Sequence, residues 1–334
     1  MHQLVNGVWR PARFAPATQG GEFVRPESQF RRWITADGRS GFPAEAGRYH
    51  LYVSLACPWA HRTLIFRKLK GLDDAVSVSV VHPHMGDEGW VFGECEGCTP
   101  DTVNGCRRLY EVYTLADPSY TGLVTTPTLW DKERRTIVNN ESADIIRMLN
   151  GEFDAYAAHD ADFYPPALRE EIDEINAYVY DNVNDGVYRA GFADSQAAYE
   201  QAFDDVFRAL TTLEARLAEQ RYLVGGRLTE ADLRLFPTLV RFDAVYYSHF
   251  KCNLRRLIDC ENLWSYTREI YQMPGVAETV NLDHIKRHYY TSHPGLNPSG
   301  IVPKGPMLDF ARPHDRDRLR RSGPRVGGSR GAAV

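Results

Sequence analysis

The chain has 334 residues, of which 43% are hydrophobic and 25% are charged, and its formal net charge is -5. This length and apolar content are enough to bury a full core, in two domains or in one large one. The net charge gives no reason to expect a nucleic-acid partner. No apolar run approaches about 18 residues and no signal-peptide pattern opens the chain, so we expect a cytoplasmic protein that does not enter a membrane.

The first half of the chain has the pattern of an α/β domain. Residues 49–56 (YHLYVSLA) and 74–82 (DAVSVSVVH) are strand-like, and residues 58–70 between them are helical. Together they predict a β-α-β unit with parallel strands and a right-handed crossover. Residues 126–140 then predict two short strands around a charged turn, and a helix follows from residue 141. This order is typical of a thioredoxin-like domain.

From about residue 163 the pattern becomes helical. Apolar residues recur at helical spacing over 165–183, 196–220 and 228–246, and Thr229 with Asp232 forms a capping box at the start of the third helix. We find no strand pattern between residues 163 and 290, so this part of the chain is expected to be an all-helical domain.

The expected domain organisation has four parts. They are an N-terminal extension over 1–45, a thioredoxin-like domain over 46–155, a helical domain over 160–306 and a C-terminal extension over 307–334. The last 24 residues carry seven arginines among Gly, Pro and Ser. Because so few large apolar side chains could anchor such a segment, we predict disorder from about residue 311.

Cys57 lies where the first predicted strand meets the following helix. Pro58 suits the first helical position, because its missing N–H costs nothing there. The sulfur would then lie beside unpaired N–H groups that favour an anion, and only a thiolate is nucleophilic. Since residue 60 is Ala and not a second cysteine, an external thiol must release any mixed disulfide on Cys57. The alternative is a buried, inert cysteine in a core helix.

The other five cysteines do not suggest a disulfide scaffold in a chain of this length, and in the cytosol they would be mostly reduced. His82, His84, Cys95 and Cys98 lie within seventeen residues and are the ligand types of a tetrahedral zinc site. A single C-x2-C pair is a weak signal, so we predict no bound metal and keep zinc as the alternative. Buried or bystander thiols are expected at Cys106, Cys252 and Cys260.

Motifs along the chain, to about Pro306, carry a family resemblance. They are ACPWAHR, GWVF, TTPTLWD, IVNNESADIIRM, NDGVYRAGF, LTEADLRLFPTLVRFDAVY, HFKCN, IYQMPGVAETV and HIKRHYY. Together they resemble the glutathionyl-hydroquinone reductases, the Xi class of glutathione transferases. The resemblance implies a thioredoxin-like N-terminal domain, a helical C-terminal domain and a homodimer. It also implies glutathione as co-substrate, with no bound cofactor.

The activity that this resemblance implies is thiol-dependent removal of glutathione from glutathionyl-hydroquinones. The cysteine at the position of Cys57 attacks the sulfur of the conjugate, the hydroquinone leaves, and a second glutathione releases oxidised glutathione from the enzyme. Two phenols would hydrogen-bond or protonate the leaving group, and the matching residues are Tyr188 and, in preference to Tyr290, Tyr289.

The thiol-binding residues implied by the resemblance are Trp90, Thr126, Pro127, Glu141 and Ser142. The Trp90 indole would cover the tripeptide. A cis peptide before Pro127 would leave the backbone of Thr126 to pair with the ligand. Glu141 would take the α-amino group and Ser142 a carboxylate at the start of a helix, with a helix cap alone as the alternative.

One departure concerns the thiol itself. The family commonly has an arginine where this chain has Leu123, and a lost charge-assisted contact could weaken thiol binding by about 1.5–3 kcal/mol. Mycothiol is therefore an alternative to glutathione, although Arg107 or Arg108 could restore the charge. A non-catalytic, transferase-like binding module is a further alternative, against which the retained Cys57 argues.

Overall fold

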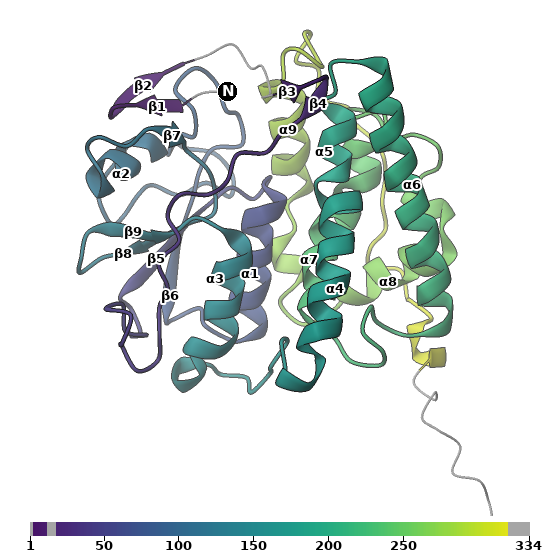
Figure 1. Cartoon of the computed structure of the whole chain (residues 1–334), viewed down its shortest axis with the longest axis horizontal. Helices are drawn as coiled ribbons and strands as arrows, with labels where there is room; N and C mark the ends of the chain where they lie inside the picture. The colour runs from purple at the N-terminus through teal and green to yellow at the C-terminus, as the bar shows by residue number, and fades with distance from the viewer. Residues whose placement is uncertain (1–2, 12–17, 320–334) are drawn as a thin grey trace, which may run out of the picture.

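The computed structural model describes residues 3–11 and 18–319. An α/β half and a helical half lie side by side (Figure 1). The α/β half is built on a four-stranded sheet of order β6-β5-β8-β9, with β5 Tyr49–Val53, β6 Val76–Val80, β8 Thr128–Asp131 and β9 Thr136–Asn139. Strands β5 and β6 are parallel and are joined by α1 (Pro58–Leu69), whereas β8 runs antiparallel to β5 and β9. The predicted β-α-β and β-β-α order of a thioredoxin-like domain is confirmed.

The sheet is buried on both faces, so that even polar side chains of its strands, such as His50 and Thr128, are buried. Tyr49, Leu51 and Val53 belong to one hydrophobic core, whereas Tyr52 belongs to a second core on the other face. The first core includes α1 and α3 (Ser142–Arg147), and the second includes α2 (Leu109–Ala116). Helices α1 and α3 therefore lie between the sheet and the helical half (Figure 1).

The helical half contains six α-helices among the described residues. They are α4 Arg169–Val179, α5 Gly186–Gly191, α6 Gln196–Glu219, α7 Glu230–Arg241, α8 Glu261–Tyr271 and α9 Leu282–Ser292. No strand occurs between residues 163 and 290, all of which are described, as predicted. The capping box of α7 is present, with the Thr229 N–H donating to the Asp232 carboxylate at 2.8 Å. The α4 and α7 helices each continue as a π-helical turn, over Tyr180–Asn184 and Phe242–Tyr246.

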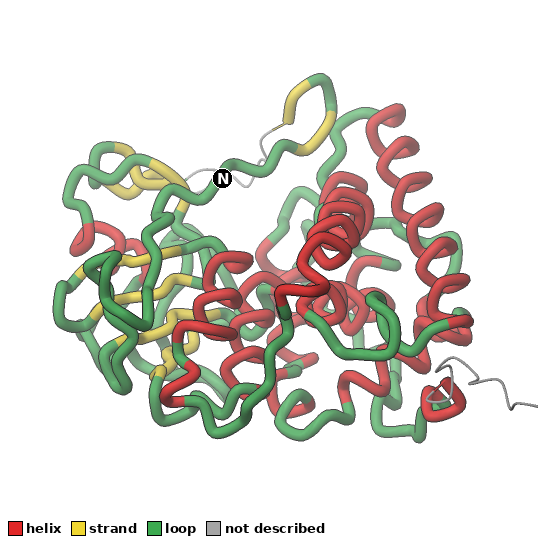
Figure 2. Tube along the Cα trace, turned by 60° about the horizontal axis from the view of Figure 1, so that its bottom comes forward, coloured by secondary structure: helices red, strands yellow, loops and turns green. Residues whose placement is uncertain are grey.

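The N-terminal extension contains four strands that the sequence did not predict. Strand β1 (Gln3–Val5) pairs with β2 (Val8–Arg10) on one side and with β7 (Gly122–Leu123) on the other, and β3 (Thr18–Gln19) pairs with β4 (Glu22–Phe23). The segment after β4 then runs from the helical half to the sheet (Figure 2). Arg25 forms an ion pair with Asp185 beside α5, and the Arg32 N–H donates to the carbonyl of Val138 in β9. The extension therefore links the two halves.

The prediction of disorder from about residue 311 is wrong for residues 311–319. Arg316 is fully buried and donates to the carbonyls of Leu217, Gln220 and Arg221 at the end of α6. Those carbonyls have no partner within the helix, so a single arginine can anchor a segment whose composition is otherwise that of a disordered tail. The rest of that prediction, residues 320–334, lies outside the described residues. Within the described ranges, no helix is long and apolar enough to cross a membrane.

Candidate active site

Cys57 lies at the junction of β5 and α1, as predicted. It is the N-cap of α1, in an extended backbone conformation, and Pro58 follows in the first turn. Its side chain is partly exposed, and its thiol donates to the Thr126 carbonyl at 3.3 Å. Burial raises the pKa of three other thiols, those of Cys106 and Cys252 to about 12 and that of Cys260 to about 11. The alternative of an inert core thiol therefore describes these three cysteines better than Cys57.

Cys57 opens into a cleft of about 180 Å³, here called the Cys57 cleft, whose walls come from both halves. The α/β half contributes Trp59 and Trp90, and the helical half contributes Tyr188, His288 and Tyr289. The Trp90 and His288 rings stack with their centroids 4.8 Å apart. A substrate that reaches the sulfur must therefore lie against side chains of the helical half.

Three tyrosines form a hydroxyl cluster behind the Cys57 cleft. The Tyr188 and Tyr289 hydroxyls hydrogen-bond to each other, and the Tyr246 hydroxyl lies 3.0 Å from that of Tyr289. Desolvation raises the pKa of all three phenols, so they are neutral and able to donate at physiological pH. Tyr246 was not predicted as a site residue, although it is the last residue of the motif RFDAVY.

A second cleft of about 270 Å³, here called the Glu141 cleft, lies next to the first and shares with it Arg25, Trp59, Leu123, Thr125 and Thr126. It is also lined by Pro127, Glu141 and Ser142, so four of the five predicted thiol-binding residues line it and the fifth, Trp90, lines the Cys57 cleft. The Thr126–Pro127 peptide is cis, as predicted.

Glu141 is the helix cap of α3, and it also faces the cleft. One carboxylate oxygen accepts from the Ala143 N–H at 3.0 Å, and the other accepts from the Ser28 hydroxyl at 3.2 Å. The Ser142 hydroxyl accepts a long hydrogen bond of 3.4 Å from Arg62. One oxygen of Glu141 therefore caps the helix, and the other lies beside Ser28, which lines the cleft.

The positive charge of the Glu141 cleft comes from the N-terminal extension. Arg108 is held by Glu88 and Glu111, and neither it nor Arg107 lines either cleft. Instead, Arg25 lines both clefts and Arg31 lines the Glu141 cleft. Arg25, Arg31 and Ser28 were not predicted from the sequence, because no motif or periodic pattern marks them. His288 was also missed, although it lies in the motif HIKRHYY.

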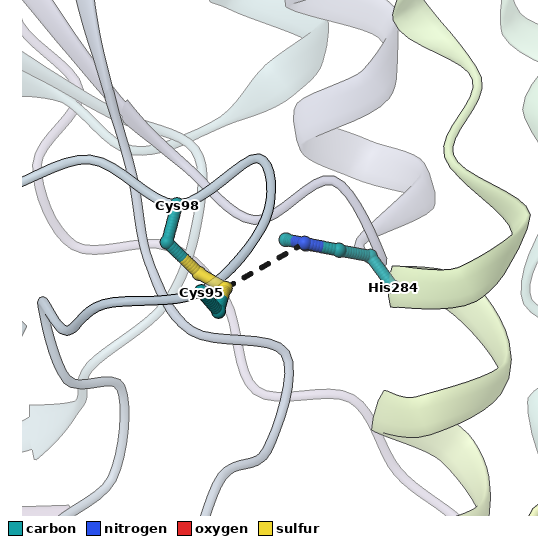
Figure 3. Close-up of side chains that lie close together, drawn as sticks. All are labelled: Cys95, Cys98 and His284. Atoms are coloured by element: carbon teal, nitrogen blue, oxygen red, sulfur yellow. Dashed lines mark hydrogen bonds between the residues drawn. A yellow bond between two sulfur atoms is a disulfide. The ribbon is translucent and has the colours of Figure 1, made fainter.

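The predicted zinc alternative is wrong in its choice of histidines. Strand β6 ends at Val80, so His82 and His84 lie in a loop where strand alternation does not set their direction. His84 instead approaches the Thr291 hydroxyl at 2.9 Å, whereas Cys95 and Cys98 form a disulfide that the sequence did not predict. Among residues 3–11 and 18–319, the group that could hold a metal is Cys95, Cys98 and His284 (Figure 3).

Two family models match the chain. They are the N-terminal domain of glutathione S-transferase over residues 56–152 and its C-terminal domain over residues 196–269. The glutathionyl-hydroquinone reductase YqjG of Escherichia coli is 56% identical over 324 residues, which are 95% of this chain and 99% of that protein. The glutathionyl-hydroquinone reductase PcpF of Sphingobium chlorophenolicum is 55% identical over 92% of this chain and 96% of its own.

Solved structures agree with these relatives. The glutathione-bound structure of YqjG superposes with a TM-score of 0.88 at 54% identity, covering 94% of this chain and 99% of that one. The Xi-class transferase of Natrialba magadii superposes with a TM-score of 0.90 at 52% identity, covering 96% and 97%. The family resemblance noted from the motifs is therefore confirmed, and the chain belongs to the glutathionyl-hydroquinone reductases, the Xi class of glutathione transferases.

Proposed function

We propose that this enzyme uses glutathione to reduce glutathionyl-hydroquinones through a mixed disulfide on Cys57. The observation that carries this proposal is the position of the Cys57 thiol, which opens into a cleft walled by the Tyr188 and Tyr289 phenols. The nucleophilic thiol and the two proton-donating phenols therefore line the same cleft between the two halves. The names of the two curated relatives support the same reaction.

In the first step, the Cys57 thiolate attacks the sulfur of the conjugate. A disulfide to glutathione forms, the bond between sulfur and the ring breaks, and its electron pair leaves with the ring, which gains a proton. The Tyr188 and Tyr289 hydroxyls can supply that proton or hydrogen-bond the ring oxygen where negative charge develops. Their raised pKa keeps both phenols protonated before the reaction.

In the second step, a further glutathione thiolate attacks the mixed disulfide. Oxidised glutathione leaves and the Cys57 thiolate is restored, which completes the exchange. The residue at position 60 is Ala, so a resolving cysteine is missing from the CPWA motif. The co-substrate must therefore supply the second thiol.

We place the glutathione peptide in the Glu141 cleft, with Trp90 covering it from the Cys57 cleft. The Thr126 backbone beside Pro127 would pair with the peptide, Glu141 would accept from the α-amino group, and Ser142 would hold a carboxylate. Arg25 and Arg31 would replace the charge that Leu123 does not supply. Both curated relatives are named for glutathione, which supports glutathione over mycothiol as the co-substrate.

Assembly as a homodimer and a cytoplasmic location stay predictions from the sequence. The proposed substrates are small thiols and quinol conjugates, and the clefts are of a size for such molecules.

The proposal is tested with Cys57→Ser. Release of hydroquinone from a glutathionyl-hydroquinone, followed by chromatography, should be abolished. Cys106→Ser is the matched control, because that thiol lies outside both clefts, and it should keep wild-type activity. If Cys57→Ser stays within a few-fold of wild type, the proposed reaction is wrong.

A further inference from the structure

We propose that Cys95, Cys98 and His284 form a second site, which binds one zinc-class cation when the two cysteines are reduced and cannot bind it when they form a disulfide. The three side chains come from two separate parts of the chain, a loop after Trp90 and the first turn of α9 (Figure 3). Their ligand atoms all lie within 4.8 Å of one another. Nothing in the proposed reaction uses them.

The distance between one of the sulfurs and the imidazole suits a tetrahedral cation. Zinc–sulfur bonds of about 2.3 Å and zinc–nitrogen bonds of about 2.0 Å put neighbouring ligands roughly 3.6 Å apart. The distance from Cys95 Sγ to His284 Nε2 is 3.8 Å. The C-x2-C turn that carries both sulfurs is closed by a hydrogen bond of 3.1 Å from the Cys98 N–H to the Cys95 carbonyl. The two sulfurs are bonded to each other in the disulfide, so after reduction they must move apart from about 2 Å to roughly 3.8 Å to complete the ligand set.

The disulfide is poorly placed to act as a structural crosslink. Cys95 and Cys98 are three residues apart in sequence, so the bridge closes a very short loop. The stabilisation expected from restricting the unfolded chain grows with loop length and is small here. Both cysteines are also partly exposed, so a small thiol can reach them. These features favour a pair of cysteines that is reversibly oxidised and reduced.

His284 can bind a cation through Nε2 if its ring changes tautomer. In the disulfide form, Nε2 lies 2.6 Å from the Glu96 carbonyl and donates to it. Nδ1 is buried and no hydrogen-bond partner for it appears among the described residues. A cation binds neutral imidazole at Nε2 only when the ring proton lies on Nδ1, so metal binding would move the proton there and replace the hydrogen bond to Glu96. The ring itself is 1% exposed, so its position is fixed in advance.

The chemistry of the ligands selects the cation. Two thiolates and an imidazole suit zinc and other thiophilic ions rather than calcium or magnesium, which prefer oxygen. Three protein ligands leave a fourth position for water or a small thiol. A disulfide offers no thiolate, so the ion is released when the disulfide of a small thiol oxidises the pair by exchange and leaves as two molecules of the reduced thiol. Reduction takes two molecules of a small thiol, which lose their protons to Cys95 and Cys98 and join to form their own disulfide.

Cobalt titration of the full chain tests the site. Protein reduced by a phosphine and freed of it without air should bind one Co²⁺, with thiolate-to-cobalt absorption and the visible bands of tetrahedral cobalt. Zinc should displace the cobalt, and the unreduced protein should show neither band. Cys98→Ser should lose this spectrum, and His284→Asn should weaken binding by more than about tenfold. His84→Asn, which changes a nearby histidine outside the cluster, should bind as wild type.

A second measurement guards against misfolded variants. In the reduced wild type, zinc should protect Cys95 and Cys98 from alkylation, as read by mass spectrometry, while Cys57 keeps reacting. Failure of the reduced wild type to take up one equivalent would overturn the proposal. It would also be overturned if His284→Asn, with an unchanged unfolding curve, bound cobalt as tightly as wild type. Neither outcome bears on the Cys57 reaction.

Discussion

The indole ring of Trp90 stacks on the imidazole ring of His288, with 4.8 Å between their centroids. The contact joins the α/β half to α9 inside the Cys57 cleft, and the His288 Nδ1–H donates to the Pro83 carbonyl at 2.9 Å. Desolvation by burial lowers the pKa of His288 to about 4. The ring is therefore neutral in the folded enzyme at physiological pH, which suits its stacked position.

This lowered pKa predicts a loss of stability in acid. An unfolded histidine takes up a proton below about pH 6.5, whereas folded His288 does so only below about 4. The free energy of unfolding should therefore fall as the pH drops from about 6.5 to about 4. His288→Gln, which keeps a donor for Pro83, should make this fall less steep in urea unfolding followed by tryptophan fluorescence. His159→Gln, at an exposed position, is the control, and an identical slope in both variants would contradict the prediction.

Tyr188→Phe should impair the release of hydroquinone without impairing disulfide exchange at Cys57. The phenol contact strengthens as charge appears on the leaving group, so its loss should lower kcat by about 10- to 1,000-fold. Formation of the Cys57 mixed disulfide with a simple activated disulfide should remain, because that leaving group needs no proton. Rapid-quench mass spectrometry can follow both reactions. Tyr156→Phe, at an exposed site, should leave both unchanged, and equal loss of both in Tyr188→Phe would show a structural role.

Arg25→Gln should weaken glutathione binding. The Arg25 guanidinium lines both clefts, and its Nη2 is buried without a hydrogen-bond partner among the described residues. Losing a charge-assisted contact should raise the KM for glutathione roughly 10- to 100-fold. Arg39→Gln is the control, since Arg39 pairs with Asp37 on the exposed surface.

A KM that is unchanged in Arg25→Gln would mean that the absent arginine at Leu123 is compensated elsewhere. Parallel assays with glutathione and mycothiol should favour glutathione in the wild type. A preference for mycothiol would contradict the assignment of the thiol.

Arg316→Ala should destabilise the helical half. The Arg316 side chain is fully buried and satisfies three carbonyls at the end of α6. Leaving those groups without donors should cost about 2–4 kcal/mol in the free energy of unfolding. Arg318→Ala removes a half-exposed ion pair with Asp315 and a hydrogen bond to Asn262, and it should change stability by only about 1 kcal/mol. Similar effects in both variants would mean that the segment is not anchored by Arg316.

The parts of the fold that the sequence predicted are those governed by local patterns. The apolar run at Tyr49–Val53, the proline after Cys57 and the capping box of Thr229 each act within a few residues, and each was found where expected. The predicted strands were too long, since β6 ends at Val80 and residue 82 already lies in a loop. The alternation of Val and Ser predicts the strand β6, but it does not show that the neighbouring strand β5 ends at Val53 and that the pairing ends with it.

The contacts that the sequence did not predict join distant segments. Arg25 packs over the Tyr188 ring at 4.8 Å, and Cys95 lies 3.8 Å from His284 although 189 positions separate them. No periodic pattern in the sequence predicts such a long-range contact, because the contact depends on how the two halves pack. Arg316 shows the same limit from the other side. Composition predicted disorder for residues 311–319 and could not reveal the three carbonyls that the Arg316 side chain satisfies.

The four free thiols differ in reactivity, so the active sites of the enzyme can be titrated. Of the four free thiols, those of Cys106, Cys252 and Cys260 have a raised pKa, and only Cys57 opens into a cleft. While the Cys95–Cys98 disulfide is intact, a mild thiol reagent added to folded protein should therefore consume one equivalent per chain, and added after denaturation it should consume four. The first number gives the concentration of working sites in such a preparation. The same asymmetry would let a covalent inhibitor label one chosen residue without protecting groups or prior mutation.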